Sequence, residues 1–147
     1  MLDNQFTFLK GLIEKRIEGI NSRRIYYRKC AFRAFISTAA LAALNTILLG
    51  LHIDQLSIEL KNTALVVSSI ITIINTYNAF FNYKELWIGN NDALNRFYAL
   101  KFNIQYYENG TPPLDPNQVD IFKNEYQSIL DELNQTWQKS RLDNHKN

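Results

Sequence analysis

Two long runs of the chain carry no formal charge, residues 34–53 and 62–83, and charged residues flank both runs. An α-helix rises about 1.5 Å per residue, so roughly 20 residues cover the ~30 Å hydrocarbon core of a bilayer. Both runs reach that length. The pattern therefore predicts a transmembrane hairpin, with one helix over residues 34–53, a short loop over residues 54–61, and a second helix over residues 62–83.

A soluble all-α bundle with two buried helices is the alternative. The composition is only 46% hydrophobic, and the mean hydropathy is slightly negative, as in many soluble proteins. The charges, however, are crowded into residues 1–33, residues 54–61 and the chain from residue 84 onward. A soluble bundle normally spreads charges along every helix. The segregation of charge favours the membrane interpretation.

The basic residues predict the orientation of the hairpin. Of the 16 Lys and Arg residues, only Lys61 lies in the loop, and the rest lie before the first run or after the second. By the positive-inside rule, both termini are expected in the cytoplasm and the loop on the outer side. Cations and tryptophan beside the runs are the candidate membrane-interface residues: Arg28, Lys29, Arg33, Lys84 and Trp87.

The first 33 residues have the apolar periodicity of an amphipathic helix that runs into the first span. Its apolar side chains recur at three- and four-residue steps: Phe6, Leu9, Ile13, Ile17 and Ile20. Such a stripe either lies on anionic lipid or packs against other helices of the protein. The Leu and Ile spacing favours packing within the protein.

The chain after the second run predicts two further helices. Leu94, Phe97, Tyr98 and Phe102 continue helical spacing as far as Tyr107. The segment GTPPLDPNQ holds all three prolines and is expected to be a loop.

The last helix is expected to begin at this loop, with Asp115 as its cap, Pro116 at its first position and Gln118 completing a capping box. Its apolar residues have heptad spacing: Val119, Phe122, Tyr126, Ile129, Leu133 and Trp137. The predicted fold class is therefore all-α, a two-helix transmembrane hairpin with a cytosolic helical bundle. The N-terminal helix and two helices within residues 84–147 form that bundle.

Small side chains share one face of the first run. Ala34, Thr38 and Ala42 form a small-xxx-small arrangement, which lets another helix backbone approach closely. These candidate helix-packing residues contact either the second span or a neighbouring subunit, and spacing alone leaves both open.

Polar side chains share one face of the second run: Ser68, Thr72, Asn75 and Asn82. An amide in hydrocarbon costs free energy unless it is hydrogen-bonded, so this face is expected to meet water or other helices. The four residues are candidate pore-lining or interhelical residues, and the two roles do not exclude each other.

No pattern in the chain indicates catalysis. His52 and His145 lie on opposite sides of the bilayer in the predicted topology, and there is no Gly-rich phosphate loop or zinc-binding His-Glu-x-x-His helix. A single cysteine, Cys30, excludes an intrachain disulfide and a Cys-based zinc site. We expect no catalytic residue, cofactor or metal. Lipid phosphates explain the basic run before residue 34 better than nucleic acid does.

The order of these segments resembles the SLATT/DUF4231 group of bacterial two-helix membrane domains. The resemblance rests on the basic helix entering the first span, the short loop, Trp87, the Tyr106-Tyr107-x-x-Gly110 segment, the proline loop and the helix that ends in Trp137. It implies an inner-membrane effector that oligomerises and forms a pore or perturbs the membrane in antiphage or conflict signalling. A cytosolic sensor or nucleotide-signalling partner is implied as the activator. The alternative is a non-conducting membrane scaffold that docks a cytosolic partner through its helical bundle.

The predicted topology can be tested by labelling. Single cysteines placed near Ser57 should react with membrane-impermeant reagents from outside the cell, while cysteines near Asn124 should react only after permeabilisation, because the bilayer separates the two positions. Labelling of both positions from the same side would contradict the hairpin.

Overall fold

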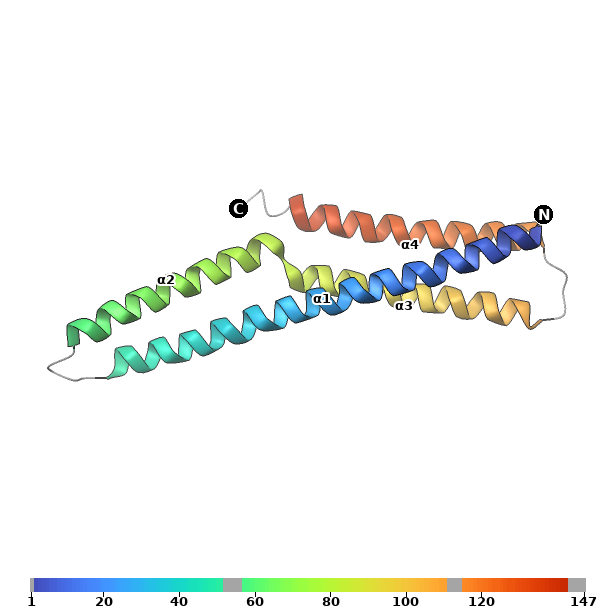
Figure 1. The fold of residues 1–147 in the computed structure, drawn as a ribbon. Coiled ribbons are helices and arrows are strands. Elements are labelled where there is room, and N and C mark those ends of the chain that lie inside the picture. The colour runs from blue at the N-terminus through green and yellow to red at the C-terminus, as the bar shows by residue number, and fades with distance from the viewer. Residues whose placement is uncertain (1, 52–56, 111–114, 143–147) are drawn as a thin grey trace. The chain divides into compact units, whose positions relative to one another are not determined.

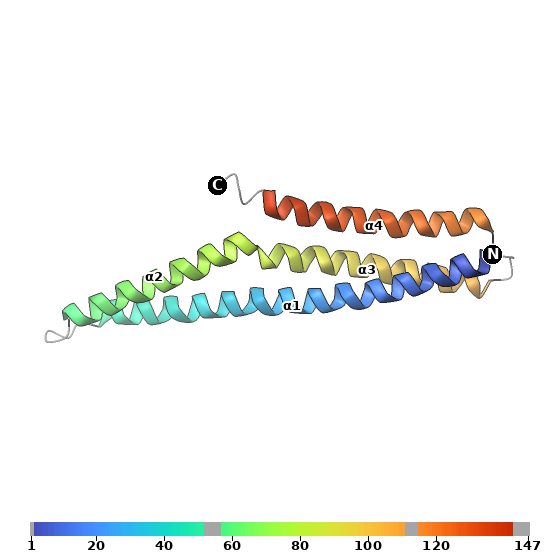
Figure 2. The ribbon, with the colours of Figure 1, turned by 45° about the horizontal axis from the view of Figure 1, so that its top comes forward.

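The computed structural model describes residues 2–51, 57–110 and 115–142, and every regular element in these ranges is an α-helix (Figures 1 and 2). The helices are α1 (Leu2–Gly50), α2 (Ser57–Phe81), α3 (Tyr83–Glu108) and α4 (Pro116–Leu142). The predicted all-α class is confirmed. The chain divides into two compact units, residues 1–27 with 84–147, called here the bundle, and residues 28–83, called here the hairpin.

The core of the bundle is formed by one face each of α1, α3 and α4. The N-terminal stripe predicted from the sequence is buried in this core along its whole length, from Phe6 to Ile20. Phe97 of α3 is fully buried and meets Tyr126 of α4 edge-on, with ring centroids 5.6 Å apart. The alternative in which the stripe packs within the protein is therefore confirmed, because these side chains are no longer available to lipid.

The heptad of α4 is buried as far as Ile129. Leu133 packs half-buried against the core, whereas Trp137 is about half exposed. The start of the helix follows the prediction in part. The backbone N–H of Asn117 donates to Oδ1 of Asp115 over 3.1 Å, as expected of a cap. The N–H of Asp115 itself donates to the hydroxyl of Tyr107 over 3.1 Å and not to Gln118, so the expected capping box is not formed. Asp115 thus satisfies one of the amides that the first turn leaves without an intrahelical partner.

The apolar stripe predicted for α3 is partly wrong. Leu94 and Phe97 are buried as expected, but Tyr98 and Phe102 are exposed, and Leu100 and Ile104 are buried in their place. Both stripes have helical spacing, so periodicity did not distinguish them. The stripe with Leu100 and Ile104 belongs to the core because it is the one that packs with α1 and α4.

The helix boundaries around α2 also differ from the prediction. α2 begins at Ser57, so residues 57–61 are helical and do not belong to the loop expected over residues 54–61. The helix ends at Phe81, and Asn82 has a φ of 45°. Asparagine is among the few residues other than glycine that tolerate this left-handed conformation. It separates α2 from α3 by a single residue, and α3 begins at Tyr83, well before Leu94, the first apolar position from which this helix was predicted.

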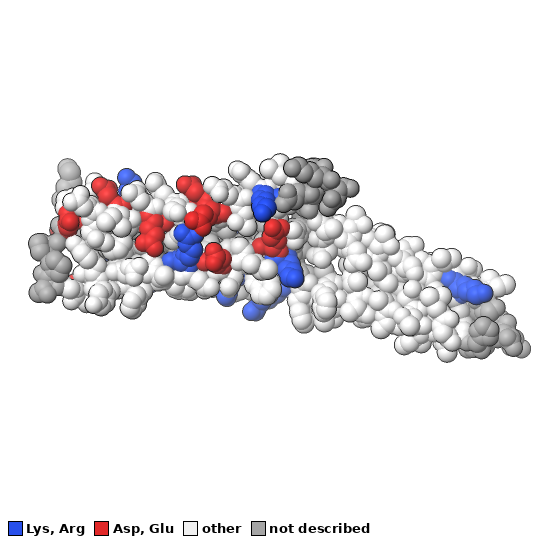
Figure 3. Space-filling model, turned by 180° about the vertical axis from the view of Figure 1, so that it is seen from behind, with Lys and Arg blue, Asp and Glu red and all other residues white. Residues whose placement is uncertain are grey.

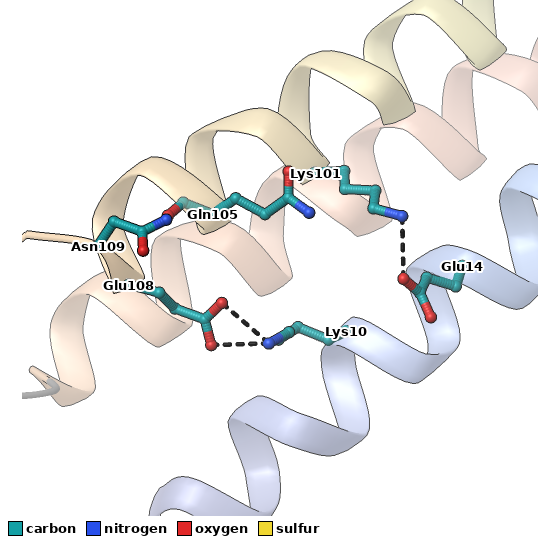
Figure 4. Close-up of polar contacts among 6 residues, drawn as sticks. All are labelled: Lys10, Glu14, Lys101, Gln105, Glu108 and Asn109. Atoms are coloured by element: carbon teal, nitrogen blue, oxygen red, sulfur yellow. Dashed lines mark hydrogen bonds and ion pairs between the residues drawn. The ribbon is translucent and has the colours of Figure 1, made fainter.

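Two ion pairs join α1 and α3 at the surface of the bundle (Figure 4). Nζ of Lys10 lies 2.7 and 2.9 Å from the two carboxylate oxygens of Glu108, and Nζ of Lys101 lies 2.9 Å from Oε1 of Glu14. The hydrogen bond and the charge of Lys101 lower the pKa of Glu14. Because that pKa is lowered on folding, the stabilisation is present at neutral pH and is lost as the pH falls through the folded-state pKa. Exposed pairs of this kind add little to stability, and they mainly favour one antiparallel register.

The bundle core generates a stability prediction with a neighbouring control. Phe97→Ala should lower the free energy of unfolding by about 3–5 kcal/mol, because it removes a fully buried ring and leaves a cavity. Tyr98→Ala removes an exposed ring from the next position and should change it by less than about 0.5 kcal/mol. Denaturant unfolding of the detergent-solubilised protein, followed by far-ultraviolet circular dichroism, measures both. Equal losses would contradict the assignment of the core face.

Candidate functional site

The hairpin is held together by a seam of small and apolar side chains that repeat at three- and four-residue steps. On α1 the half-buried positions are Ala31, Ala34, Thr38, Leu41, Asn45 and Leu48. On α2 the buried or half-buried positions include Leu60, Ala64, Val67, Ile71, Ile74, Asn78 and Phe81. This is the spacing by which paired helices interlock their side chains.

Two side-chain hydrogen bonds cross the seam. Nδ2 of Asn45 donates to Oγ of Ser68 over 3.1 Å, and Oγ1 of Thr38 donates to Oδ1 of Asn75 over 3.3 Å. A step of seven residues forward on α1 corresponds to seven residues backward on α2. The two bonds therefore define one antiparallel register for the hairpin.

The seam accounts for some of the candidate residues and leaves others exposed. Ala34 and Thr38 are half-buried on it, while Ala42 is exposed beside it, and Leu41 and Asn45 take the contact positions. On α2, Ser68 lies on the seam, and Thr72 and Asn75 are exposed next to it. Asn82 lies beyond the end of α2, at the turn into α3, so it does not continue the polar stripe of that helix.

The two flanks of the seam differ in chemistry. Successive residues of a helix are about 100° apart, so the residue after a seam position lies on one flank of the helix and the residue before it lies on the other. In an antiparallel pair of helices, the flanks formed by the residues after the seam positions lie on the same side of the pair. One side presents exposed small or polar residues in its middle part, called here the small-polar face: Ala39, Ala42, Thr46, Thr72, Asn75 and Thr76. Phe35, Leu49 and Leu65 are exposed on the same flank toward its two ends. The other presents exposed large residues, called here the bulky face: Leu44, Ile47, Val66, Ile70, Ile73 and Tyr77.

Hydrogen bonding singles out Asn75 on the small-polar face. The hydroxyl groups of Thr46, Thr72 and Thr76 each donate to the backbone carbonyl four residues earlier in their own helix, so they need no other partner. Asn75 accepts from Thr38, but its Nδ2 group donates to none of the described residues. An amide with two unused donors is the group on this surface that gains most from a further polar partner.

The outer surface of the hairpin carries few charges and many exposed apolar side chains. Two helical stretches are long and apolar enough to cross a membrane. One lies in α1, and the other lies in the helical run that begins at Ile58. None of the first stretch and 11% of the second is buried, whereas a core helix of a soluble protein would be mostly buried. On the side drawn in Figure 3, acidic and basic side chains gather over the bundle and are nearly absent from the hairpin.

The candidate interface residues lie at the ends of the uncharged runs. Arg28, Lys29 and Arg33 are exposed on α1 of the hairpin, Lys84 is exposed in the first turn of α3, and Trp87 is half-buried one turn later. His52, His145 and the loop residue Asp54 lie outside the described residues. Within the described ranges, no three His, Cys, Asp or Glu side chains are arranged to hold a metal ion.

Comparisons of the chain with protein-family models, with curated proteins and with solved structures find no match.

Asn45 is a seam residue that the sequence analysis did not single out. It is the only amide in the first uncharged run and lies seven residues after Thr38, so the heptad spacing contained the signal. Its Oδ1 atom is buried and has no hydrogen-bond partner among the described residues. A polar residue at such a position favours one register at a cost in stability.

The Asn45–Ser68 hydrogen bond can be measured by a double-mutant cycle. Asn45→Ala and Ser68→Ala should show a coupling energy of about 0.6 kcal/mol, and at most ~1.7 kcal/mol, as found for hydrogen bonds between membrane helices. Unfolding in mixed micelles of mild detergent and dodecyl sulfate provides the free energies. Thr46→Ala paired with Ser68→Ala is the control, because the Thr46 hydroxyl bonds only within α1, and this pair should be additive. Coupling of the same size in both cycles would contradict a direct bond.

Proposed function

We propose that the chain is an inner-membrane protein of bacteria that crosses the bilayer twice, with both termini in the cytoplasm, and assembles with copies of itself through the small-polar face. The assembly makes the membrane permeable, as an effector in antiphage or conflict signalling of the abortive-infection type. Lipid, further copies of the chain and a cytosolic activating partner are the components that this function requires.

The unused donors of Asn75 are the observation that carries the proposal. Asn75 is exposed on α2, near the middle of the uncharged run over residues 62–83. In hydrocarbon, each unmade hydrogen bond of an amide costs about 1–3 kcal/mol on protein-derived scales. A second copy or a water-filled path would satisfy the donors, while lipid chains would not.

The alanines beside Asn75 support close approach of another helix. Ala39 and Ala42 are exposed on the same face, and small side chains let helix backbones come near enough for dispersion and hydrogen bonding to act. The bulky face offers Leu, Ile and Val side chains that match lipid tails. We infer that the small-polar face is covered by protein or water and the bulky face by lipid.

Permeability follows if several copies turn part of this face toward a common axis. Thr72, Asn75 and Thr76 would then supply hydroxyl and amide groups to a pore wall without any ionisable group. Such a wall is wetted by its polar groups but carries no fixed charge, which suits leakage of ions and small solutes better than selection among ions. The proposed biological role rests on the resemblance of the sequence to two-helix effector domains.

A non-conducting scaffold is the second candidate, and one surface of the bundle favours it. Tyr98, Phe102 and Tyr106 on α3 are exposed by 50%, 64% and 76%, and the rings of Phe102 and Tyr106 stack with centroids 6.3 Å apart. Exposed aromatic side chains in a row are typical of protein interaction sites. In this alternative the hairpin only anchors the chain, and the aromatic row binds a cytosolic protein.

Permeability and assembly can be measured on the same preparations. The purified protein, reconstituted in vesicles at a high protein-to-lipid ratio to favour assembly, should release a small entrapped dye. Asn75→Leu should lower the release rate about tenfold or more, because an apolar constriction dewets, while insertion into the vesicles is unchanged. Ala42→Leu should reduce oligomer size and release together, because it places a large side chain on the small-polar face.

Ala40→Leu is the matched control for assembly. Ala40 is also an exposed alanine of α1, but it lies toward the bulky face, so the same substitution should leave oligomer size and release unchanged. Equal effects of Ala40→Leu and Ala42→Leu would contradict assembly through the small-polar face. Unchanged release by Asn75→Leu together with a smaller oligomer would contradict the pore and leave the scaffold.

A further inference from the structure

A cavity of about 220 Å³ lies within the bundle, between α1, α3 and α4. Tyr27 and Leu86 both line it, and both lie close in sequence to the points where the chain passes between the bundle and the hairpin. The cavity is several times the ~30 Å³ that one water molecule occupies. It is smaller than the roughly 300–1,000 Å³ of pockets for drug-sized ligands, so it suits a small polar group with a short apolar extension.

α3 and α4 approach each other closely beside the cavity. A Cβ atom at Gly89 would lie 2.8 Å from Cγ2 of Thr136, so the absence of a side chain at Gly89 permits the contact. Leu130 and Leu133 of α4 and Leu86 of α3 provide the apolar part of the wall. α1 contributes the polar side, two helical turns long, from Arg16 to Arg23.

The charge of the cavity is positive. Arg16 and Arg23 line it, and no carboxylate does among the described residues. Neither arginine forms an ion pair with a described residue, although Nε of Arg23 donates to the carbonyl of Gly19 over 3.3 Å. Other cations of the bundle, such as Lys10 and Lys101, are paired with glutamates. Two unpaired guanidinium groups on one cavity form a site for an anion.

Amide groups add hydrogen-bonding capacity to the same wall. Asn90 is only 6% exposed, and its Nδ2 donates to the carbonyl of Leu86 over 2.7 Å. Its Oδ1 accepts no hydrogen bond from the described residues, so a hydroxyl group in the cavity would find an acceptor there. Asn134 is exposed at the wall and can donate to an anionic oxygen.

We propose that this cavity binds a phosphate ester, with the phosphate between Arg16 and Arg23, a hydroxyl at Asn90 and the apolar part against Leu130, Leu133 and Trp137. Guanidinium groups bind phosphate through paired N–H donors, which gives the site its preference for phosphate oxygens. The phosphate can belong to the headgroup of an anionic phospholipid or to a free phosphate compound, and the site chemistry is the same for both. This site is separate from the small-polar face of the hairpin.

Trp137 provides a direct readout of binding. The chain has two tryptophans, so Trp87→Phe leaves Trp137 as the only tryptophan. The full-length variant in mild detergent is titrated with three probes: dihexanoyl phosphatidylglycerol, dihexanoyl phosphatidylcholine and inorganic phosphate. We expect a saturable change of Trp137 fluorescence with phosphatidylglycerol and binding of phosphatidylcholine at least tenfold weaker, because its choline cation opposes the arginines.

Charge variants separate the site from general electrostatic attraction. Each of Arg16→Gln and Arg23→Gln should weaken binding about tenfold, the effect of one charge-assisted hydrogen bond, and the double variant should abolish it. Lys15→Gln with Lys123→Gln is the matched control, because it removes two exposed cations of the bundle that do not line the cavity. Circular dichroism verifies the fold of each variant. If the double variant does not fold, the loss of affinity in the two single variants is compared with that of the lysine control.

The outcomes distinguish the sources of the phosphate. Arginine-dependent binding of phosphatidylglycerol assigns the site to a lipid headgroup, and arginine-dependent binding of inorganic phosphate without binding of phosphatidylglycerol assigns it to a soluble phosphate compound. The proposal is overturned if no probe gives a saturable change, or if the lysine control loses as much affinity as the arginine variant. Since no leakage is measured, failure of the pore proposal leaves this result unaffected.

Discussion

The repeat of buried positions along α1 is the constraint on which both units depend. The buried and half-buried residues of this 49-residue helix recur at three- and four-residue steps from Phe6 to Leu48. In the bundle these positions hold large apolar side chains, with Arg24 as an exception, and in the hairpin they hold alanine, threonine and asparagine as well as leucine. Large apolar residues gain free energy by leaving water, whereas small residues gain by close backbone approach. The change in composition along one stripe therefore matches a change in what drives packing.

The same stripe explains how much of the fold the sequence predicts. Periodicity identifies the buried face of α1 and of α4 because each helix offers only one apolar stripe. α3 offers two, and the aromatic stripe with Tyr98 and Phe102 is the more conspicuous, yet contacts with α1 and α4 select Leu100 and Ile104. The start of α2 at Ser57 could not be predicted in this way, since neither a glycine nor a proline marks it. Asn45 shows the converse case. Its spacing from Thr38 indicated a seam position, but a single amide among alanines and leucines is easily overlooked.

Polar interactions in the two units serve different ends. On the bundle surface, Lys10–Glu108, Lys101–Glu14 and Arg96–Glu132 are exposed to water, where ion pairs add little to stability. In the hairpin, Asn45 and Thr38 bond across a seam whose surroundings are apolar, where the alternative to a bond is an unsatisfied group. The bundle can thus lose any one ion pair at small cost, while the register of the hairpin depends on few bonds.

The weakness of a single hydrogen bond between membrane helices bears on how the proposed assembly is controlled. Hydrogen bonds of this kind contribute about 0.6 kcal/mol each, which changes an association constant less than threefold. The donors of Asn75 can therefore direct which face associates without making association irreversible. In the proposed assembly, alanine packing would add to this, and copies of the hairpin would remain close to the balance between separate and assembled states. A partner that binds the bundle of the assembled form more tightly by a few kcal/mol would shift that balance by two orders of magnitude or more. Weak contacts in the hairpin are thus a requirement for control from the bundle, since a strongly self-associating hairpin would perturb the membrane without a signal.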